Sequence, residues 1–195
     1  MARATVLTIG HSSHPLATFL GMLATAGASH VVDVRSVPAS RRYPHFAGRR
    51  LAASLAACGI GYLWLGIELG GRPADPSLIA AGVPDYEAMA RRPAFAEGLG
   101  HVARLARDAR PALMCAEREP LACHRALLVA RHLVARGLDV RHILGDGRLE
   151  DHAETERRLV AAVRHEMSDM FDTAAGSGLD GAYRLGVRRA RLKRR

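Results

Sequence analysis

The stretch Pro111-Ala112-Leu113-Met114-Cys115-Ala116-Glu117, followed by Cys123-His124-Arg125-Ala126-Leu127-Leu128, decides the fold of this chain. Its first part is an apolar run that predicts a short buried strand, and its last part predicts the start of a helix. Between Cys115 and Arg125 the chain places two thiols, two carboxylates, an imidazole and two guanidiniums. Because open α/β sheets place their ligands at strand-to-helix junctions, the stretch indicates a site without naming its reaction.

Strand-like and helix-like segments alternate on both sides of this stretch. The predicted strands are Thr5–Ile9, His30–Val34, Gly61–Trp64, Ala112–Cys115 and Val140–Leu144. Helical spacing of apolar residues predicts helices that include Pro15–Leu23, Leu51–Cys58, Tyr86–Met89, Phe95–Arg107, Ala126–Arg136 and His152–Met170. The alternation predicts an α/β fold, a single three-layer domain with a mainly parallel sheet of about five strands and flanking helices. We expect a long loop over Arg72–Pro84, of the kind that often covers a site.

The composition limits the class of protein. A chain of 195 residues, 49% hydrophobic and 24% charged, suits one globular domain. It has no run of about eighteen apolar residues and no secretory signal, so we expect no membrane partner. Three cysteines are too few for a disulfide framework, and we therefore expect a reducing, cytoplasmic location.

The C-terminal residues carry most of the net charge of +9. Residues 184–195 hold seven of the 28 Lys and Arg residues and no acidic residue, and Thr173–Gly181 has the composition of a flexible linker. We therefore predict an α/β domain over residues 1–172 and a flexible linker with a basic, Arg-rich tail over residues 173–195. The tail either holds nucleic acid electrostatically or is a solvated extension without a partner.

Polar side chains follow four of the predicted strands, and the C-terminal ends of parallel strands meet at one edge of a sheet. We therefore expect these side chains to converge on one pocket. They are His11 and Ser12 after the first strand, Asp33 and Arg35 after the second, Glu68 after the third, and Cys115 and Glu117 after the fourth.

Several of these residues also have a purely structural explanation. Asp33 and Arg35 are equally well explained as a buried ion pair. His11 either polarises a substrate or only caps the next helix or bonds a carbonyl. Glu68 is either a general acid or base or a partner of backbone amides in a tight turn. Cys115, at the end of a buried strand, is in this view an inert thiol.

Cys123 is different because it lies at the start of a predicted helix, beside His124 and Arg125. A helix N-terminus and nearby cations lower the pKa of a thiol, so Cys123 is a candidate nucleophile, redox thiol or metal ligand. Arg125 suits an anion such as phosphate. The spacing lacks the Cys-x2-Cys pair of structural zinc sites, so we assign no metal ligand and no cofactor from the sequence. Cys58, on an apolar helix, is expected in the core.

Four ordered motifs between Thr5 and His152 resemble the domain-of-unknown-function 488 (DUF488) family. They are Thr8-Ile9-Gly10-His11-Ser12, Asp33-Val34-Arg35-Ser36-Val37-Pro38, Leu65-Gly66-Ile67-Glu68-Leu69-Gly70-Gly71, and Cys115-Ala116-Glu117 with Cys123-His124-Arg125. The resemblance implies an α/β fold and a site shared by the motif residues. It implies no reaction, and the Arg-rich tail is not part of the pattern.

We interpret these residues first as an enzyme that acts on a small anionic or nucleotide-like substrate. In this hypothesis the catalytic residues are Glu117, Cys115, Glu68, Asp33 and His11. The substrate-binding residues are Ser12, Arg35, Arg41, Cys123, His124 and Arg125.

A second hypothesis is a nucleic-acid-binding module. It would use the basic tail and the Arg41–Arg50 loop, in which basic and aromatic side chains alternate as in single-strand binders. A third is a metal-binding or thiol redox protein. The substrate, the cofactor and the oligomeric state stay open.

Overall fold

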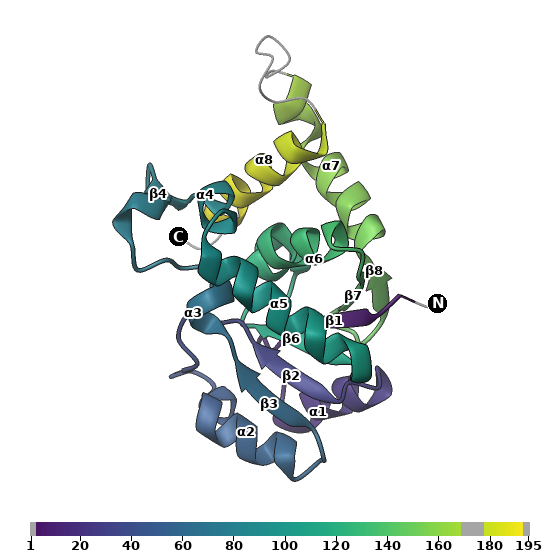
Figure 1. Ribbon diagram of the computed structural model, residues 1–195. Coiled ribbons are helices and arrows are strands. Elements are labelled where there is room, and N and C mark those ends of the chain that lie inside the picture. Colours follow the sequence, from purple (N-terminus) through teal and green to yellow (C-terminus); the bar gives the residue numbers. More distant parts are fainter. Residues whose placement is uncertain (1–2, 169–177, 193–195) are drawn as a thin grey trace.

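A six-stranded sheet forms the centre of the computed structural model, which describes residues 3–168 and 178–192 (Figure 1). Its strand order is β3-β2-β6-β1-β7-β8. The five predicted strands are all present and parallel, and they are β1 (Thr5–Gly10), β2 (His30–Asp33), β3 (Gly61–Trp64), β6 (Pro111–Cys115) and β7 (Asp139–Ile143). The sixth strand, β8 (Leu149–Asp151), pairs antiparallel with β7. It was missed because its three residues are mostly charged and exposed.

Helices cover both faces of this sheet and make the predicted three-layer α/β fold. One face packs against α1 (Leu16–Thr25) and α2 (Gly48–Ala56). The other packs against a larger set, which is α3 (Gly66–Leu69), α5 (Pro93–Asp108), the π-helix η4 (Arg125–Ala130), α6 (Arg131–Ala135) and α7 (His152–Ser168). Two further short helical turns are η1 (Pro44–Phe46) and η3 (Pro120–Ala122).

The alternation of side chains along β6 shows how the core is divided. Ala112 and Met114 belong to the apolar cluster on the side of α1 and α2, whereas Leu113 and Cys115 belong to the cluster on the opposite side. This follows from the two-residue period of a strand. Cys115 therefore faces the layer that contains α3, α5 and η4.

The segment predicted as a loop over Arg72–Pro84 contains short regular elements. They are the turn η2 (Pro76–Leu78) and an antiparallel hairpin of β4 (Ile79–Ala80) and β5 (Val83–Pro84), after which α4 (Tyr86–Ala90) begins. Strands of two residues are too short to leave a periodic pattern in the sequence.

The helix after the opening stretch begins as a π-helix. All six residues of η4 are buried, so the segment has no polar face to show helical periodicity. π-Helical turns are rare and frequently lie at functional sites. The irregular turn follows Cys123 and His124 directly.

The predicted flexible tail is corrected at residues 179–192, which form the helix α8 (Leu179–Leu192). It packs on α7 above the sheet (Figure 1), and Ala182, Tyr183 and Leu185 are buried. The arginines fall between these apolar positions, so a high basic content concealed an amphipathic helix. Residues 173–177 of the predicted linker and Met170 of the predicted last helix lie outside the described residues. Within the described ranges, no helix is long and apolar enough to cross a membrane.

Candidate functional site

The strand order places the loop after β6 between the ends of β1 and β2. The backbone N–H of His11, just after β1, donates to the carbonyl of Cys115 at 2.8 Å. The N–H of Val34, just after β2, donates to the carbonyl of Met114 at 3.0 Å. Three segments that are far apart in the sequence therefore meet at one edge, as expected from the parallel sheet.

Gly10 allows this loop to lie against the end of β1. A Cβ atom at position 10 would lie 1.8 Å from the carbonyl oxygen of Glu117, which is backbone and cannot rotate away. Any other residue at position 10 would therefore push the loop outward. This close approach fixes the path of the chain between Cys115 and Arg118.

Four side chains of this loop form a compact cluster. The Cys115 Sγ atom lies 2.7 Å from Glu117 Oε2, and Cys123 Sγ lies 3.2 Å from the same oxygen. The Nδ1 atom of His124 is 3.5 Å from Cys115 Sγ and 3.8 Å from Cys123 Sγ. All four atoms lie within 4.8 Å of one another. Cys115, Cys123 and His124 are buried, and Glu117 is half-buried.

The two thiols differ in acidity. Burial raises the pKa of Cys115 well above its usual value, and the contact with Cys123 adds to this effect. Burial acts in the same direction on Cys123, but the hydrogen bond with Cys115 and the positive charge of Arg125 outweigh it and lower the pKa of Cys123. Burial alone would lower the pKa of His124, but the adjacent Cys123 thiolate raises it. The cluster therefore favours a thiolate on Cys123.

His124 is held from two sides. Its Nε2 atom lies 2.8 Å from the carbonyl oxygen of Val34. Since a carbonyl only accepts, Nε2 carries the proton. Gly71 packs against the ring, because a Cβ atom there would lie 2.4 Å from His124 Cγ. Nδ1 is therefore the ring nitrogen directed at the two sulfur atoms.

Asp33 and Arg35 form a buried ion pair, one of the two explanations left open by the sequence. Arg35 donates through Nε and Nη2 to the two carboxylate oxygens of Asp33, at 2.9 and 2.6 Å. Arg35 Nη2 also bonds the carbonyl of Phe46, and Tyr62 donates its hydroxyl to Asp33 at 2.8 Å. The charge of Arg35 is thus largely compensated within the protein.

His11 supports this pair and does not line the cavity described below. Its Nε2 atom lies 3.3 Å from Arg35 Nη1, its Nδ1 atom lies 2.9 Å from the carbonyl of Ser12, and its ring stacks on Phe46. Burial lowers the pKa of His11 to about 4, so the ring is neutral at physiological pH. Ser12 is half-buried and donates its backbone N–H to the carbonyl of Ala116.

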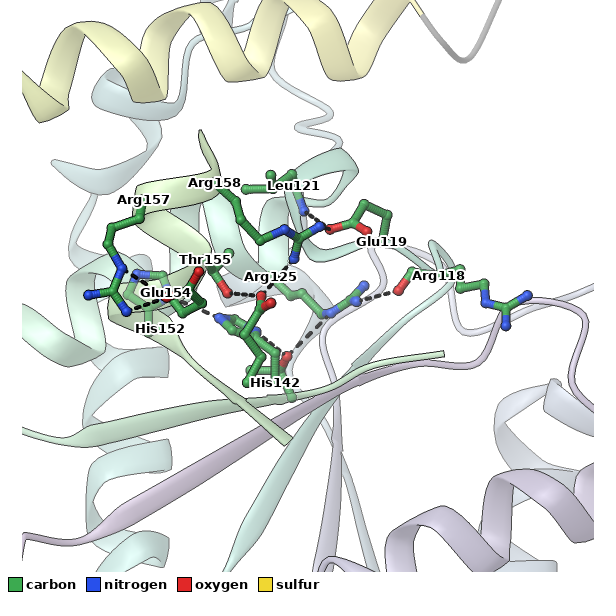
Figure 2. Close-up of polar contacts among 12 residues, drawn as sticks. Arg118, Glu119, Leu121, Arg125, His142, His152, Glu154, Thr155, Arg157 and Arg158 are labelled. Carbon is green, nitrogen blue, oxygen red and sulfur yellow. Dashed lines mark hydrogen bonds and ion pairs between the residues drawn. The ribbon is translucent and has the colours of Figure 1, made fainter. Parts of the chain in front are cut away.

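Arg125 is fully buried behind the loop. Its guanidinium donates to the carbonyls of Glu117 and Arg118, at 2.5 and 2.9 Å, and to Thr8 Oγ1 at 3.3 Å. Figure 2 shows Arg125 extended toward Arg118. The predicted anion-binding residue is thus placed as a brace for the loop.

A chain of buried hydrogen bonds continues from Thr8 into the upper layer. Thr8 Oγ1 lies 2.7 Å from His142 Nδ1, His142 Nε2 lies 2.9 Å from His152 Nδ1, and His152 Nε2 lies 3.0 Å from the Tyr183 hydroxyl (His142 and His152 in Figure 2). Tyr183 donates to Glu156 at 2.8 Å. One direction of donation satisfies every link: each histidine donates from Nε2, accepts at Nδ1 and is neutral. The chain joins the centre of the sheet to α8.

A cavity of about 260 Å³ adjoins the cluster. Its lining includes Arg35, Ser36, Arg72, Cys115, Glu117 and His124. Arg72 is exposed and makes no ion pair with any carboxylate among the described residues. The cavity therefore combines an uncompensated cation with three of the four clustered side chains.

Two of the predicted site residues lie elsewhere. Glu68 lies on α3 and lines a neighbouring cavity of about 330 Å³. This cavity shares only Ser36 and Arg72 with the cavity beside the cluster. Arg41 is exposed on the loop before η1. Binding of nucleic acid by that loop stays a prediction.

Cys58 was expected in the core and is exposed, because it follows the last turn of α2. Sequence reasoning missed Arg72, Tyr62 and the histidine chain. Of these only Arg72 carried a signal, because it follows the Gly70-Gly71 pair directly.

The fold and the cluster define a three-layer α/β domain with a Cys, Glu and His site at the C-terminal edge of its sheet. The family model described as "Domain of unknown function DUF488" matches residues 15–132, more than half of the chain, and the chain therefore belongs to this family. The matched range contains Asp33, Arg35, Glu68 and the whole cluster, and it ends before α7 and α8. No curated protein and no solved structure matches the chain.

Proposed function

We propose that this protein is an enzyme that acts on a small anionic substrate. The substrate would bind in the cavity beside Arg72 and the cluster of Cys115, Glu117, Cys123 and His124, called the Cys115 cluster below. One observation carries the proposal: a cationic side chain and three chemically reactive side chains line the same cavity. The cavity lies at the C-terminal edge of a mostly parallel sheet, where α/β proteins bind their ligands. Its volume of about 260 Å³ suits a small molecule or the charged end of a nucleotide-like molecule.

The side chains divide between binding and chemistry. Arg72 would hold the anionic group, with help from the Ser36 hydroxyl and from the Nη1 group of Arg35, which Asp33 does not occupy. Cys115, Glu117 and His124 line the same cavity and are the groups that would touch the reacting atoms. Their proximity suits proton transfer or group transfer within one hydrogen-bond distance.

Asp33, His11 and Arg125 act in this proposal as positioning residues. Asp33 and His11 hold Arg35 at the cavity wall, and Arg125 holds the loop through its two carbonyl contacts. The free thiols of Cys115 and Cys123 suit a reducing compartment, and we therefore place the enzyme in the cytoplasm.

The test is anion binding by the purified protein and by a matched pair of variants. Calorimetric titration with inorganic phosphate, a sugar phosphate and a nucleoside monophosphate is expected to show binding of at least one of them. Arg72→Ala should weaken that binding by about tenfold or more, because a hydrogen bond to a charged group contributes roughly 1.5–3 kcal/mol. Arg49→Ala, which removes an exposed arginine of α2, should leave the affinity unchanged.

The reaction itself is tested with Glu117→Gln and Cys115→Ser. Both variants should retain the fold and lose turnover of the substrate class that the titration identifies. The proposal is wrong if the wild-type protein binds none of these anions at millimolar concentration, or if Arg72→Ala and Arg49→Ala bind them equally well.

A further inference from the structure

The Cys115 cluster has the spacing of a metal site. In tetrahedral zinc centres the bonds of about 2.0–2.3 Å place neighbouring ligand atoms about 3.3–3.8 Å apart. The four atoms Cys115 Sγ, Glu117 Oε2, Cys123 Sγ and His124 Nδ1 already lie 2.7–3.8 Å apart along the contacts described above, and none is more than 4.8 Å from another. Small rotations of the side chains would bring all four to one ion.

The hydrogen bonds around the cluster orient it for metal binding. The Nε2–H group of His124 donates to the carbonyl of Val34, which leaves Nδ1 as the ring nitrogen that is directed at the sulfurs and can bind a metal ion. Histidine ligands of metal ions are almost always fixed in this way by a second partner. The backbone N–H of Arg125 points at Cys123 Sγ at 3.4 Å, a contact that would stabilise a coordinated thiolate.

The chemistry of the cavity lining also favours a bound metal cation. Cys115 and Glu117 line the same cavity as Arg72, and a negative charge on this lining would repel an anionic substrate. Two sulfur atoms, a carboxylate oxygen and an imidazole nitrogen gathered within 4.8 Å of one another form a donor set that suits a metal ion. The Arg125 guanidinium is directed to the backbone carbonyls of Glu117 and Arg118, so it braces the loop instead of occupying the centre of the cluster.

We propose that Cys115, Glu117, Cys123 and His124 bind one zinc ion. Two sulfurs and an imidazole favour zinc over the oxygen-seeking Mg²⁺ and Ca²⁺. Cys115, Glu117 and His124 line the cavity and Cys123 lies behind them, so the ion would lie at the cavity floor within reach of a ligand. Its role in attracting the substrate rests on the proposed function, whereas its presence does not.

The experiment measures metal in tag-free protein purified without chelators and then loaded with zinc. The wild-type chain should retain about one zinc ion, and Co²⁺ exchanged into the site should show a sulfur-to-cobalt charge-transfer band in the near ultraviolet. Cys123→Ser should lower the zinc affinity by at least about 100-fold, because loss of an outer-shell partner alone costs 10–100-fold. Cys58→Ser removes the exposed, remote thiol and should bind zinc like wild type.

Two results would overturn the inference: less than about a tenth of an equivalent of zinc on loaded wild-type protein, or equal zinc binding by Cys123→Ser and Cys58→Ser. If Cys123→Ser does not fold, the cobalt spectrum of the wild-type protein decides. A sulfur band supports the site, and its absence overturns it. Arg72→Ala separates the two proposals, because it should keep the zinc and lose the anion. Zinc without anion binding refutes only the proposed function, and anion binding without zinc refutes only the metal site.

Discussion

The Nε2 atom of His124 lies 2.8 Å from the carbonyl oxygen of Val34, although the two residues are 90 positions apart in the chain. The bond joins the segment after β6 to the end of β2 and sets the orientation of the imidazole. The remaining ring nitrogen is then directed at Cys115 and Cys123. The site is therefore built from backbone that the sheet itself holds in place.

The three cysteines should differ in reactivity toward a thiol reagent. Cys58 is exposed, whereas Cys115 and Cys123 are buried. In native protein we expect an aromatic disulfide reagent to modify Cys58 quickly and the other two far more slowly, because access limits exchange. Denaturant should make all three reactive. Absorbance of the released aromatic thiolate measures the number of cysteines that have reacted. A fast phase that persists in Cys58→Ser would contradict the burial of the other two cysteines.

Replacement of Gly10 should destabilise the protein more than replacement of a glycine in open space. A Cβ atom at position 10 would overlap the carbonyl of Glu117, whereas nothing lies within 4 Å of a Cβ atom at Gly21 on α1. Overpacking costs about 1–3 kcal/mol, so Gly10→Ala should lower the free energy of unfolding in urea by at least that amount. Gly21→Ala should raise it by roughly 0.5–1 kcal/mol, since alanine favours a helix interior. Equal effects of the two variants would refute the close contact.

Much of the fold could be predicted because the parallel strands are short apolar runs bounded by turn residues. The convergence of Asp33, Arg35, Cys115 and Glu117 also followed from the sheet, since parallel strands end at one edge. The direction of a long side chain could not be predicted. Arg125 stands where it could receive an anion, yet it bonds the carbonyls of its own loop, and backbone partners leave no trace in the sequence.

Two other misses have local causes. Glu68 follows β3 as expected, but the four-residue helix α3 carries it into the neighbouring cavity. The basic residues after Gly181 concealed the apolar stripe of α8, which contains Ala182 and Tyr183. From its sequence, an amphipathic basic helix resembles a solvated tail. Only the surface on which it packs distinguishes the two.

Loss of the Arg125 side chain should be among the most costly substitutions in the chain. Arg125→Met removes the hydrogen bonds to the carbonyls of Glu117 and Arg118 and to Thr8 from a site that is 0% exposed. Bonds to a charged group contribute roughly 1.5–3 kcal/mol each, so the free energy of unfolding should fall by at least about 3 kcal/mol. Arg49→Met, at an exposed position of α2, should change it by about 0.5 kcal/mol or less. Similar urea midpoints for the two variants would show that Arg125 does not brace the loop.

The buried pair His142 and His152 should make stability fall as the pH falls below about 6.5. Burial lowers the pKa of His142 well below its ordinary value, and it also lowers the pKa of His152. Below about pH 6.5 the unfolded chain binds protons that the folded chain does not. Each histidine therefore lowers the free energy of unfolding by up to about 1.4 kcal/mol per pH unit below about 6.5. Above that pH both rings are neutral in the folded and the unfolded chain, and this loss of stability is absent.

A matched variant isolates this contribution from the other titrating groups. His142→Gln removes one titrating ring and leaves the remaining groups in place, so the free energy of unfolding of the wild-type protein should fall more steeply than that of the variant between pH 7 and pH 5. The difference should grow by about 2 kcal/mol over that range. Nitrogen chemical shifts of the two rings give an independent measurement, with both Nε2 atoms protonated at pH 6, as the direction of the hydrogen-bond chain from Thr8 to Tyr183 requires. Parallel stability curves, or a charged ring at pH 6, would contradict a neutral chain between the sheet and α8.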